Sequence, residues 1–400
     1  MSSDSVISAI RGRAGPVIRR LIRRLRGVSE RCVSLPPAGN RPPRGRVLFS
    51  YIIDAVLVRD PSRLPHSHPN FWETWAMAEC FRAEGYAVDV VHWTRRGPPP
   101  RLDYDIYVDV RRNFDRYAAD LPASCLKIAH MDTAHHRVHN GNQLLRLEDL
   151  RRRRGIDLAP FKLVEENHAA ENADRITVLG NEFTLESFGS AGKPIRRIRL
   201  SNAFCYPFPE DKDLDASRRR FLWMGSEGFV HKGLDLVLEA FAGLPEFDLT
   251  VCGPIEREPA FRKAFSDLLY RTPNIRTEGW VDVAGPRFRD LARQCLALVY
   301  PSCSEGGGGC VITAMHAGLI PMVTREASVD VEPDRGIQLA DASVESIQRA
   351  VRHLSARSTD ELNAMARAAW RWAREFHTRG RFMNEYRAFV QDLDHQRKLG

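Results

Sequence analysis

The sequence predicts an α/β protein made of two Rossmann-like domains, and three observations support that fold class. The chain has 400 residues, more than one compact core usually holds. Short β-rich runs alternate with amphipathic helical segments, which indicates parallel βαβ units with helices on both faces of a sheet. This alternation stops at residues 206–217, a stretch rich in proline and charge, and then restarts. Such a break is typical of a linker between domains.

The first domain is predicted to span residues 46–205. A helix is expected over residues 71–85, because Gly85 suits the position after a helix end. The expected strands are residues 46–53, 86–93, 104–110, 125–132 and 174–181.

The second domain is predicted to span residues 218–375. A glycine-rich loop and its helix are expected between the fourth and fifth strands, and two long helices complete the domain. The expected strands are residues 220–226, 247–254, 274–281, 296–302 and 320–324.

Residues 1–45 stand apart as a basic extension. Apolar side chains fall on one helical stripe, with the arginines largely elsewhere, at Val17, Ile18, Leu21, Leu25 and Val28. This pattern is typical of a basic amphipathic helix on an anionic membrane surface. A disordered or loosely docked extension is the alternative interpretation.

The composition limits the protein class. No run approaches the roughly 20 apolar residues of a membrane span, and the N-terminus lacks the apolar region of a secretory signal. The eight cysteines are scattered, which fits reduced thiols in a cytoplasm. The net charge of +8 favours anionic partners. We therefore expect a cytoplasmic protein, with peripheral association at the inner membrane face as a further option.

Four consecutive glycines, Gly306, Gly307, Gly308 and Gly309, follow Glu305 and precede an apolar helix. A glycine-rich turn that leads into a helix presents free N–H groups and the positive end of the helix dipole. The stretch therefore indicates an anion site, most often for phosphate. The alternative is a tight strand-to-helix turn that binds no ligand.

Several motifs in order resemble the retaining glycosyltransferases of family 4, which have the GT-B fold. They are "MGSEGFVHKGLDLVLEAF", "DLTVCGP", "NIRTEGWV" and "LVYPSCSEGGGGCVITAMHAGLIPMV". The resemblance is strong from about Leu222 to Thr324 and weaker before the linker. It implies two domains facing each other across a cleft, with residues 376–400 forming a helix that crosses back to the N-terminal domain.

The resemblance also implies site residues on the donor side. Lys232 would hold the donor diphosphate, a suitable task for a compact cation, and Glu305 would contact the donor sugar. The four glycines would let the backbone approach the sugar and phosphates. Cys310 and Val311 would offer N–H groups at the helix start. As alternatives, Lys232 is a surface lysine and Glu305 a capping acid.

Two donor-side positions depart from the family pattern. Thr313 stands where the resemblance implies an acid that clamps the ribose, which should weaken that contact by about 1.5–3 kcal/mol. Ser226 follows Gly225 where the family often has an arginine, so one cation for the diphosphate is missing unless another arginine supplies it. Both departures favour reduced activity without changing the fold.

In the N-terminal domain, His130 matches a histidine that faces the cleft in many family members, with Asp132 close behind. The resemblance implies a catalytic role for His130, which would contact the donor sugar or help to align the acceptor. A hydrogen-bonded strand-end histidine is the alternative. Arg137 is a candidate for an anionic acceptor, and a solvated arginine is equally compatible. Trp72 and Trp75 lie in the segment expected at the acceptor side, one of them in the core and one available to stack on a sugar.

Two other sets of residues are given no functional role. His135, His136 and His139 follow no helical ligand spacing, so no metal site is expected. The run from Arg146 to Gly155 is interpreted as a solvated helix end. No aromatic platform accompanies it, so nucleic acid is not an expected partner.

The leading hypothesis is a retaining, metal-independent glycosyltransferase without a resident cofactor. Its substrates would be a nucleotide sugar and a glycan or lipid-linked acceptor, in envelope polysaccharide synthesis. A GT-B protein with weakened catalysis, acting as a binding or scaffolding module, is the alternative motivated by Thr313 and Ser226. A sugar-phosphate epimerase of the same fold is a third option.

Overall fold

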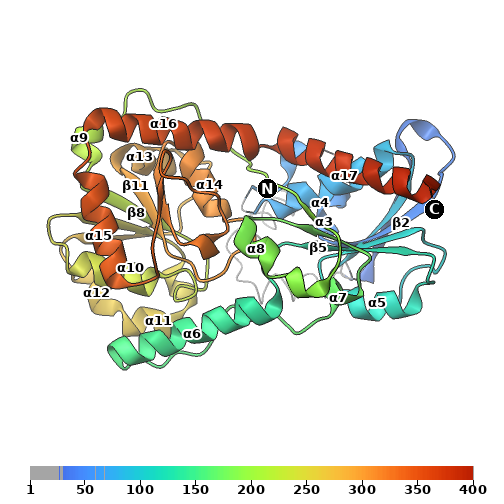
Figure 1. Cartoon of the computed structure of the whole chain (residues 1–400), viewed down its shortest axis with the longest axis horizontal. Helices are drawn as coiled ribbons and strands as arrows, with labels where there is room; N and C mark the ends of the chain where they lie inside the picture. Colours follow the sequence, from blue (N-terminus) through green and yellow to red (C-terminus); the bar gives the residue numbers. More distant parts are fainter. Residues whose placement is uncertain (1–26, 28–29, 59, 67, 400) are drawn as a thin grey trace, which may run out of the picture.

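The computed structural model describes residues 27, 30–58, 60–66 and 68–399, and this part of the chain forms two α/β domains side by side (Figure 1). The predicted basic helix near residues 17–28 lies almost entirely outside the described residues. No helix in the described ranges has the length and apolar character that crossing a bilayer requires.

The N-terminal domain is built on a seven-stranded sheet of order β1-β3-β2-β4-β5-β6-β7. All neighbours pair in parallel except β1 and β3, which are antiparallel. The strands are β1 (Cys32–Leu35), β2 (Arg46–Tyr51), β3 (Ala87–His92), β4 (Ile106–Asp109), β5 (Leu126–Met131), β6 (Arg175–Val178) and β7 (Ile195–Arg197). The helices are α3 (Asp54–Leu57), α4 (Asn70–Ala83), α5 (Phe114–Asp120), α6 (His136–Arg154), α7 (Ala169–Asn172) and α8 (Glu182–Glu186).

Strand β1 corrects the interpretation of residues 1–45 as one separate extension. Cys32 pairs with Val91 and Leu35 with Val88, so this segment forms the edge of the N-terminal sheet. Its burial alternates between exposed and half-buried positions, as expected for a strand with only one covered face. The prolines that follow it suggested a boundary in the sequence, but the folded domain begins before them.

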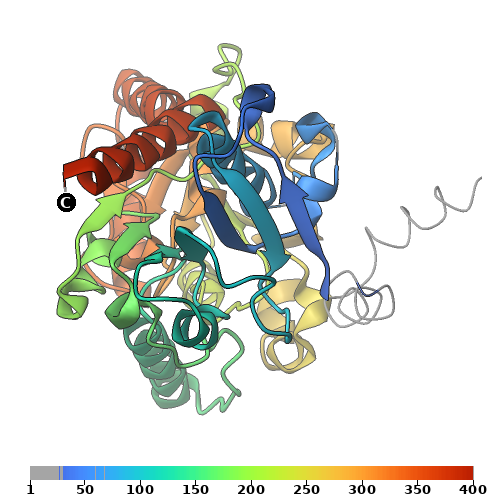
Figure 2. The same cartoon turned by 90° about the vertical axis from the view of Figure 1, so that its right-hand side faces the viewer.

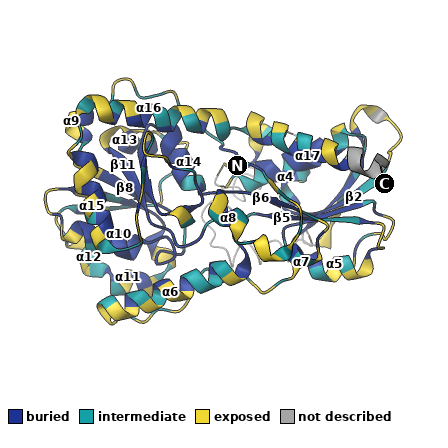
Figure 3. Cartoon of the chain, viewed as in Figure 1, coloured by how far each residue is buried: buried dark blue, intermediate teal, exposed yellow. Residues whose placement is uncertain are grey.

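The C-terminal domain is built on a parallel six-stranded sheet of order β10-β9-β8-β11-β12-β13. Its strands are β8 (Arg220–Met224), β9 (Asp248–Cys252), β10 (Ile275–Gly279), β11 (Ala297–Tyr300), β12 (Ile320–Val323) and β13 (Ile337–Gln338). Its helices are α9 (Leu214–Ser217), α10 (Leu234–Ala242), α11 (Pro259–Ala264), α12 (Ser266–Tyr270), α13 (Pro286–Gln294), α14 (Gly309–His316), α15 (Val344–Ser355) and α16 (Thr359–Phe376). Most strand residues are buried, as the dark strands of both domains show in Figure 3.

Helix α17 (Arg379–Leu399) follows α16 and returns to the N-terminal domain, where it packs on α4. Phe382 and Tyr386 are fully buried in the core of that domain. Figure 2 looks onto the N-terminal domain and shows α17 along its outer side.

Helix α6 is the second connection between the domains. It begins in the N-terminal domain and runs along the C-terminal domain beside α11 (Figure 1). Leu150 is fully buried in the C-terminal core, and Arg146 donates to the carbonyl oxygen of Pro301 at 3.0 Å. The interpretation of residues 146–155 as a solvated helix end is therefore wrong for the face that touches the C-terminal domain, because that face is covered.

Candidate active site

A cavity of about 510 Å³ lies between the two domains. It is bounded on the C-terminal side by residues 224–226, 280–284 and 305–310. On the N-terminal side it is bounded by Asp132, which follows β5, and by residues that follow β2: Pro65, His66, His68, Pro69, Asn70 and Glu73. These segments follow the carboxyl ends of parallel strands, where α/β sheets bind their ligands.

Lys232 and Glu305 meet on the C-terminal wall of this cavity. The Lys232 Nζ lies 2.6 Å from Glu305 Oε1 and donates to the Tyr300 hydroxyl at 2.8 Å. The same carboxylate oxygen accepts from Tyr300 at 2.7 Å and from Ser302 at 3.1 Å. Both members of the pair line the cavity.

Burial and pairing act in opposite directions on the two charges. Burial alone would lower the pKa of Lys232, but the Glu305 carboxylate outweighs it and raises that pKa. Burial alone would raise the pKa of Glu305, but Lys232 holds it well below its usual range. The site therefore keeps a fixed ammonium and a fixed carboxylate at neutral pH.

The glycines between Glu305 and α14 are required largely by the protein itself. A Cβ on Gly306 would overlap the backbone of Asp132 in the other domain, and one on Gly307 would lie 3.2 Å from the Leu200 side chain. Gly308 has φ 58°, the left-handed conformation that favours glycine. The loop thus lets the two domains approach closely, and the helix that follows directs its amino end into the cavity.

Gly309 and Cys310 line the cavity, whereas the Val311 side chain is fully buried in the domain core. Burial raises the pKa of the Cys310 thiol to about 11, so it is a neutral group. The first N–H groups of an α-helix lack intrahelical acceptors. Those of α14 are therefore the donors that this wall offers to an anion.

Thr313, Gly225 and Ser226 also line the cavity, as the sequence predicted for donor-side residues. The Thr313 hydroxyl lies 2.8 Å from the Gly309 carbonyl oxygen and 3.0 Å from Asn202 Oδ1. It connects α14 to the segment that leaves the N-terminal domain. A Cβ on Gly225 would come within 2.8 Å of the Trp223 ring, so this position also needs glycine.

Lys162 is a second cation near the C-terminal wall of the cavity, and it was not predicted from the sequence. Its stem lies against Gly228, where a Cβ would come within 2.6 Å of Lys162 Cγ. Burial and the neighbouring Lys232 charge lower its pKa. Lys162 belongs to the loop after α6, so only the fold brings it to the strand that lacks the expected arginine.

Asp132 lies on the N-terminal wall, as predicted, and two partners hold it. Its Oδ2 accepts from the Tyr51 hydroxyl at 2.9 Å, and its Oδ1 pairs with Arg111. Burial would raise the pKa of Asp132, but Arg111 outweighs burial and lowers it. Arg111 has φ 95°, a conformation that costs about 1–3 kcal/mol for a residue other than glycine.

Besides Val311, four residues named as candidates in the sequence do not line the cavity: His130, Arg137, Trp72 and Trp75. His130 is fully buried in β5, with Nδ1 2.8 Å from Thr177 Oγ1 and its ring between Tyr51 and Tyr386. A parallel strand is covered on both faces, so His130 points into a helix layer, while Asp132 beyond the strand end reaches the cavity.

Trp72 is 8% exposed and packs on Phe382 with ring centroids 6.0 Å apart, and Trp75 packs against the same core. Neither ring lines the cavity, which corrects the sugar-stacking interpretation. Arg137 lies on the exposed side of α6, away from the cavity. The catalytic role of His130 stays a prediction, now without a contact to support it.

Glu73 and Asn70 are polar cavity residues that the sequence analysis missed. Glu73 is fully buried, accepts from the Ser201 N–H at 2.7 Å, and has an Oε2 without a partner among the described residues. Asn70 Oδ1 likewise lacks one. Their spacing of three places both on one face of α4, a signal that the two neighbouring tryptophans hid.

The histidines near α6 have structural partners. His135 Nε2 lies 3.1 Å from Glu171, and His139 Nε2 donates to the Lys162 carbonyl oxygen at 2.7 Å. Among the described residues, no group of three or more His, Cys, Asp or Glu side chains is arranged to hold a metal ion.

Comparison with known proteins identifies the class. The chain superposes on sucrose-phosphate synthase from Thermosynechococcus elongatus with a TM-score of 0.60 at 12% identity, covering 88% of this chain and 100% of that chain. It superposes on Anabaena Alr3699/HepE in complex with UDP and glucose with a TM-score of 0.56 at 13% identity, covering 88% and 100%. A glycosyltransferase from Rickettsia africae gives 0.56 at 12% identity, covering 88% and 98%. The predicted GT-B fold is thus confirmed.

One family model matches part of the C-terminal domain: the model described as glycosyl transferases group 1 matches residues 218–357. The C-terminal domain is thus similar to group 1 glycosyltransferases over these residues, and the chain as a whole has the GT-B fold. The chain spans 57% of the length of the pneumococcal O-GlcNAc transferase GtfA, a further structure it resembles. No curated protein sequence matches it significantly.

Proposed function

We propose that the protein is a retaining glycosyltransferase that moves a sugar from a nucleotide-diphosphate donor to a hydroxyl of a glycan or lipid-linked acceptor. One observation carries the proposal: the buried Lys232 ammonium faces the interdomain cavity beside Glu305 and the amino end of α14. The HepE structure, which shares the fold, contains UDP and glucose. That content supports a nucleotide sugar as the donor.

The donor diphosphate would lie between Lys232 and the amino end of α14. Preorganised positive groups at a leaving group stabilise the charge that develops there, and this is usually the largest catalytic effect. Lys162 is the candidate for the second cation, which compensates for Ser226. Trp280, 57% exposed at the cavity wall, offers a planar surface to the nucleotide base.

The acceptor would enter from the N-terminal side, where Asn70 and Glu73 line the cavity and each has a buried oxygen without a partner in the described part of the chain. Asp132 is held by Arg111 and Tyr51, and Glu305 by Lys232, so neither carboxylate is free to attack the sugar. We therefore assign the attack to the acceptor hydroxyl on the face that the diphosphate leaves. The hydroxyl proton passes to the departing phosphate oxygen, and no metal is required.

Envelope polysaccharide synthesis and peripheral attachment at the inner membrane face are the finer parts of this proposal. They rest on the basic stripe near residues 17–28 and on the anionic partners that the +8 net charge favours. The donor chemistry does not depend on either.

The test is calorimetric titration of the protein with UDP, GDP, ADP and their common sugar conjugates. We expect one nucleotide to bind selectively, with affinity lost at least tenfold in Lys232→Ala, since hydrogen bonds to a charged group contribute about 1.5–3 kcal/mol. Lys263→Ala, which removes an exposed lysine of the same domain, is the matched control. A folded wild-type protein that binds none of them would favour the weakened, non-catalytic GT-B protein that Thr313 and Ser226 suggest.

A further inference from the structure

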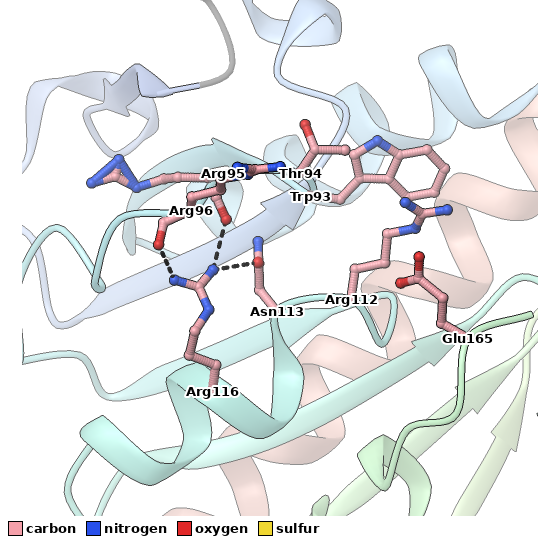
Figure 4. A pocket seen from close by; sticks show the side chains of 8 residues that line it. All are labelled: Trp93, Thr94, Arg95, Arg96, Arg112, Asn113, Arg116 and Glu165. Carbon is pink, nitrogen blue, oxygen red and sulfur yellow. Dashed lines mark hydrogen bonds between the residues drawn. The ribbon is translucent and has the colours of Figure 1, made fainter. Parts of the chain in front are cut away.

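A second hollow, of about 270 Å³, lies on the N-terminal domain outside the donor cavity. It forms where the chain leaves β3 and β4, the two strands that flank β2 in the sheet, at their carboxyl ends (Figure 4). Four arginines and one carboxylate share it: its lining residues are Trp93, Thr94, Arg95, Arg96, Arg112, Asn113, Arg116 and Glu165.

The turn at residues 95–97, on one side of this hollow, is held from two directions. Glu30 accepts the backbone N–H of Arg96 at 3.1 Å and that of Gly97 at 3.3 Å. Arg116 donates to the carbonyl oxygens of residues 95, 96 and 97, each at 2.6 Å, as Figure 4 shows for two of them. A turn held in this way presents its side chains in a fixed arrangement, which reduces the entropy lost when a ligand binds.

The arginines that line the hollow differ in how much hydrogen-bonding capacity they have left. Arg116 is committed to the turn. Arg95 donates to the Glu30 carbonyl oxygen at 2.8 Å, but its Nε is buried without a partner among the described residues. Arg112 stacks on the Trp93 ring at 4.9 Å, and Arg96 is exposed. Both guanidinium groups therefore remain available to a ligand.

The hollow is adjacent to the acceptor side of the cleft. The Trp93 ring contacts the Tyr51 ring at a centroid distance of 5.7 Å, and the Tyr51 hydroxyl binds Asp132 on the cavity wall. Arg112 directly follows Arg111, the partner of Asp132. Trp93 lines the hollow and Tyr51 lines the cavity, so these two rings in contact separate the two sites.

We infer that this hollow binds a phosphate group of the acceptor substrate. Guanidinium groups match phosphate oxygens with paired hydrogen bonds, and the four positive charges exceed the two carboxylates nearby, Glu165 and Glu30. Arg112 already covers the face of the Trp93 ring. A ligand would therefore contact the N–H edges of the arginine side chains. That the phosphate belongs to an acceptor substrate rests on the proposed function. That the site binds phosphate rests only on the residues of the hollow.

The test uses inorganic pyrophosphate in calorimetric titrations at low salt, with the full chain. The C-terminal wall of the interdomain cavity also attracts phosphate. The titrations are therefore made with Lys232→Ala, in which that wall has lost its ammonium group. We expect Arg96→Gln combined with Arg112→Gln to weaken the remaining binding by about tenfold or more, because two charge-assisted contacts are lost. Arg137→Gln, which removes an exposed arginine from another surface, should leave it unchanged. Equal binding in all variants, or equal loss with Arg137→Gln, would overturn the site.

Two further measurements separate the possible sources of the phosphate and the two proposals. Loss of sedimentation with phosphatidylcholine–phosphatidylglycerol vesicles in the double variant would assign the phosphate to a lipid. Unchanged sedimentation together with lost pyrophosphate binding would assign it to a soluble phosphorylated acceptor. The double variant should keep the nucleotide affinity of wild type. A wild-type protein that binds pyrophosphate in the hollow but no nucleotide would contradict the transferase and retain the phosphate site.

Discussion

Glu73 combines full burial with an oxygen that lacks a partner among the described residues. Burial raises the pKa of the Glu73 carboxyl from its ordinary value of 4.5 to about 7. Between these two values the unfolded chain releases the proton while the folded protein keeps it. The free energy of unfolding therefore falls as pH rises through this window, by roughly 3 kcal/mol in total at 1.36 kcal/mol per pKa unit.

We expect Glu73→Gln to remove this pH dependence, because glutamine has no proton to lose and can still accept from the Ser201 N–H. Relative to wild type, the variant should gain about 2–3 kcal/mol in unfolding free energy between pH 5 and pH 8. Urea unfolding at both pH values measures this difference. If the unfolding free energies of the two proteins differ by the same amount at both pH values, Glu73 is already ionised in the folded protein.

At the scale of elements, local motifs could be predicted from the sequence and tertiary contacts could not. Lys232, Glu305 and the glycines line the cavity as predicted, because each lies at a strand end or helix start that the hydrophobic pattern located. Glu73 lines it because of where α4 packs, and Lys162 because of where a loop folds. His130 is buried because α17 covers its side of β5, and α17 follows it by more than two hundred residues.

Helix α6 is another element whose tertiary contacts could not be predicted from its sequence. Its arginines have the composition of a solvated helix, yet Arg153 Nη2 lies 2.7 Å from the fully buried Asp235 carboxylate and also contacts Glu239 of α10. Burial raises the pKa of Asp235 to about 6. The Arg153–Asp235 ion pair therefore joins the two domains, and the Arg153 charge favours the ionised form of the Asp235 carboxyl.

Arg153→Gln should therefore lower the free energy of unfolding by about 3 kcal/mol at pH 8, since the buried Asp235 carboxylate loses its hydrogen-bonded cation and keeps only the charge of Arg146 nearby. The loss should be smaller at pH 5, where Asp235 takes up a proton. Adding Asp235→Asn to the same chain should recover most of it. Arg151→Gln, on the exposed face of α6 and paired with Glu148, should change stability by less than about 1 kcal/mol. Equal losses in the two arginine variants, measured by urea unfolding, would contradict the interdomain contact.

At the scale of the whole molecule, helix α6, the α16–α17 pair and the glycine loop are among the contacts that hold the two domains against each other. Helix α6 and the α16–α17 pair lie on opposite sides of the molecule (Figure 1). Between them the glycine loop touches the end of β5, with Gly306 against the backbone of Asp132. A GT-B enzyme that closes around its donor excludes water from the transfer. Among the glycines of the cavity wall, Gly306 is the one whose added Cβ would lie nearest to the opposite domain.

Gly306→Ala tests whether that approach determines the closed arrangement. The added Cβ would overlap the Asp132 backbone, and backbone atoms cannot give way as a flexible side chain does, so the domains must separate. A compact chain of 400 residues has a radius of gyration of about 21 Å, and small-angle scattering should give a larger value for Gly306→Ala than for wild type. Gly141→Ala is the control, because a Cβ there meets nothing within 4 Å in the middle of α6. If both variants scatter like wild type, the loop yields instead of the domains, and closure is set by α6 and the C-terminal helices alone.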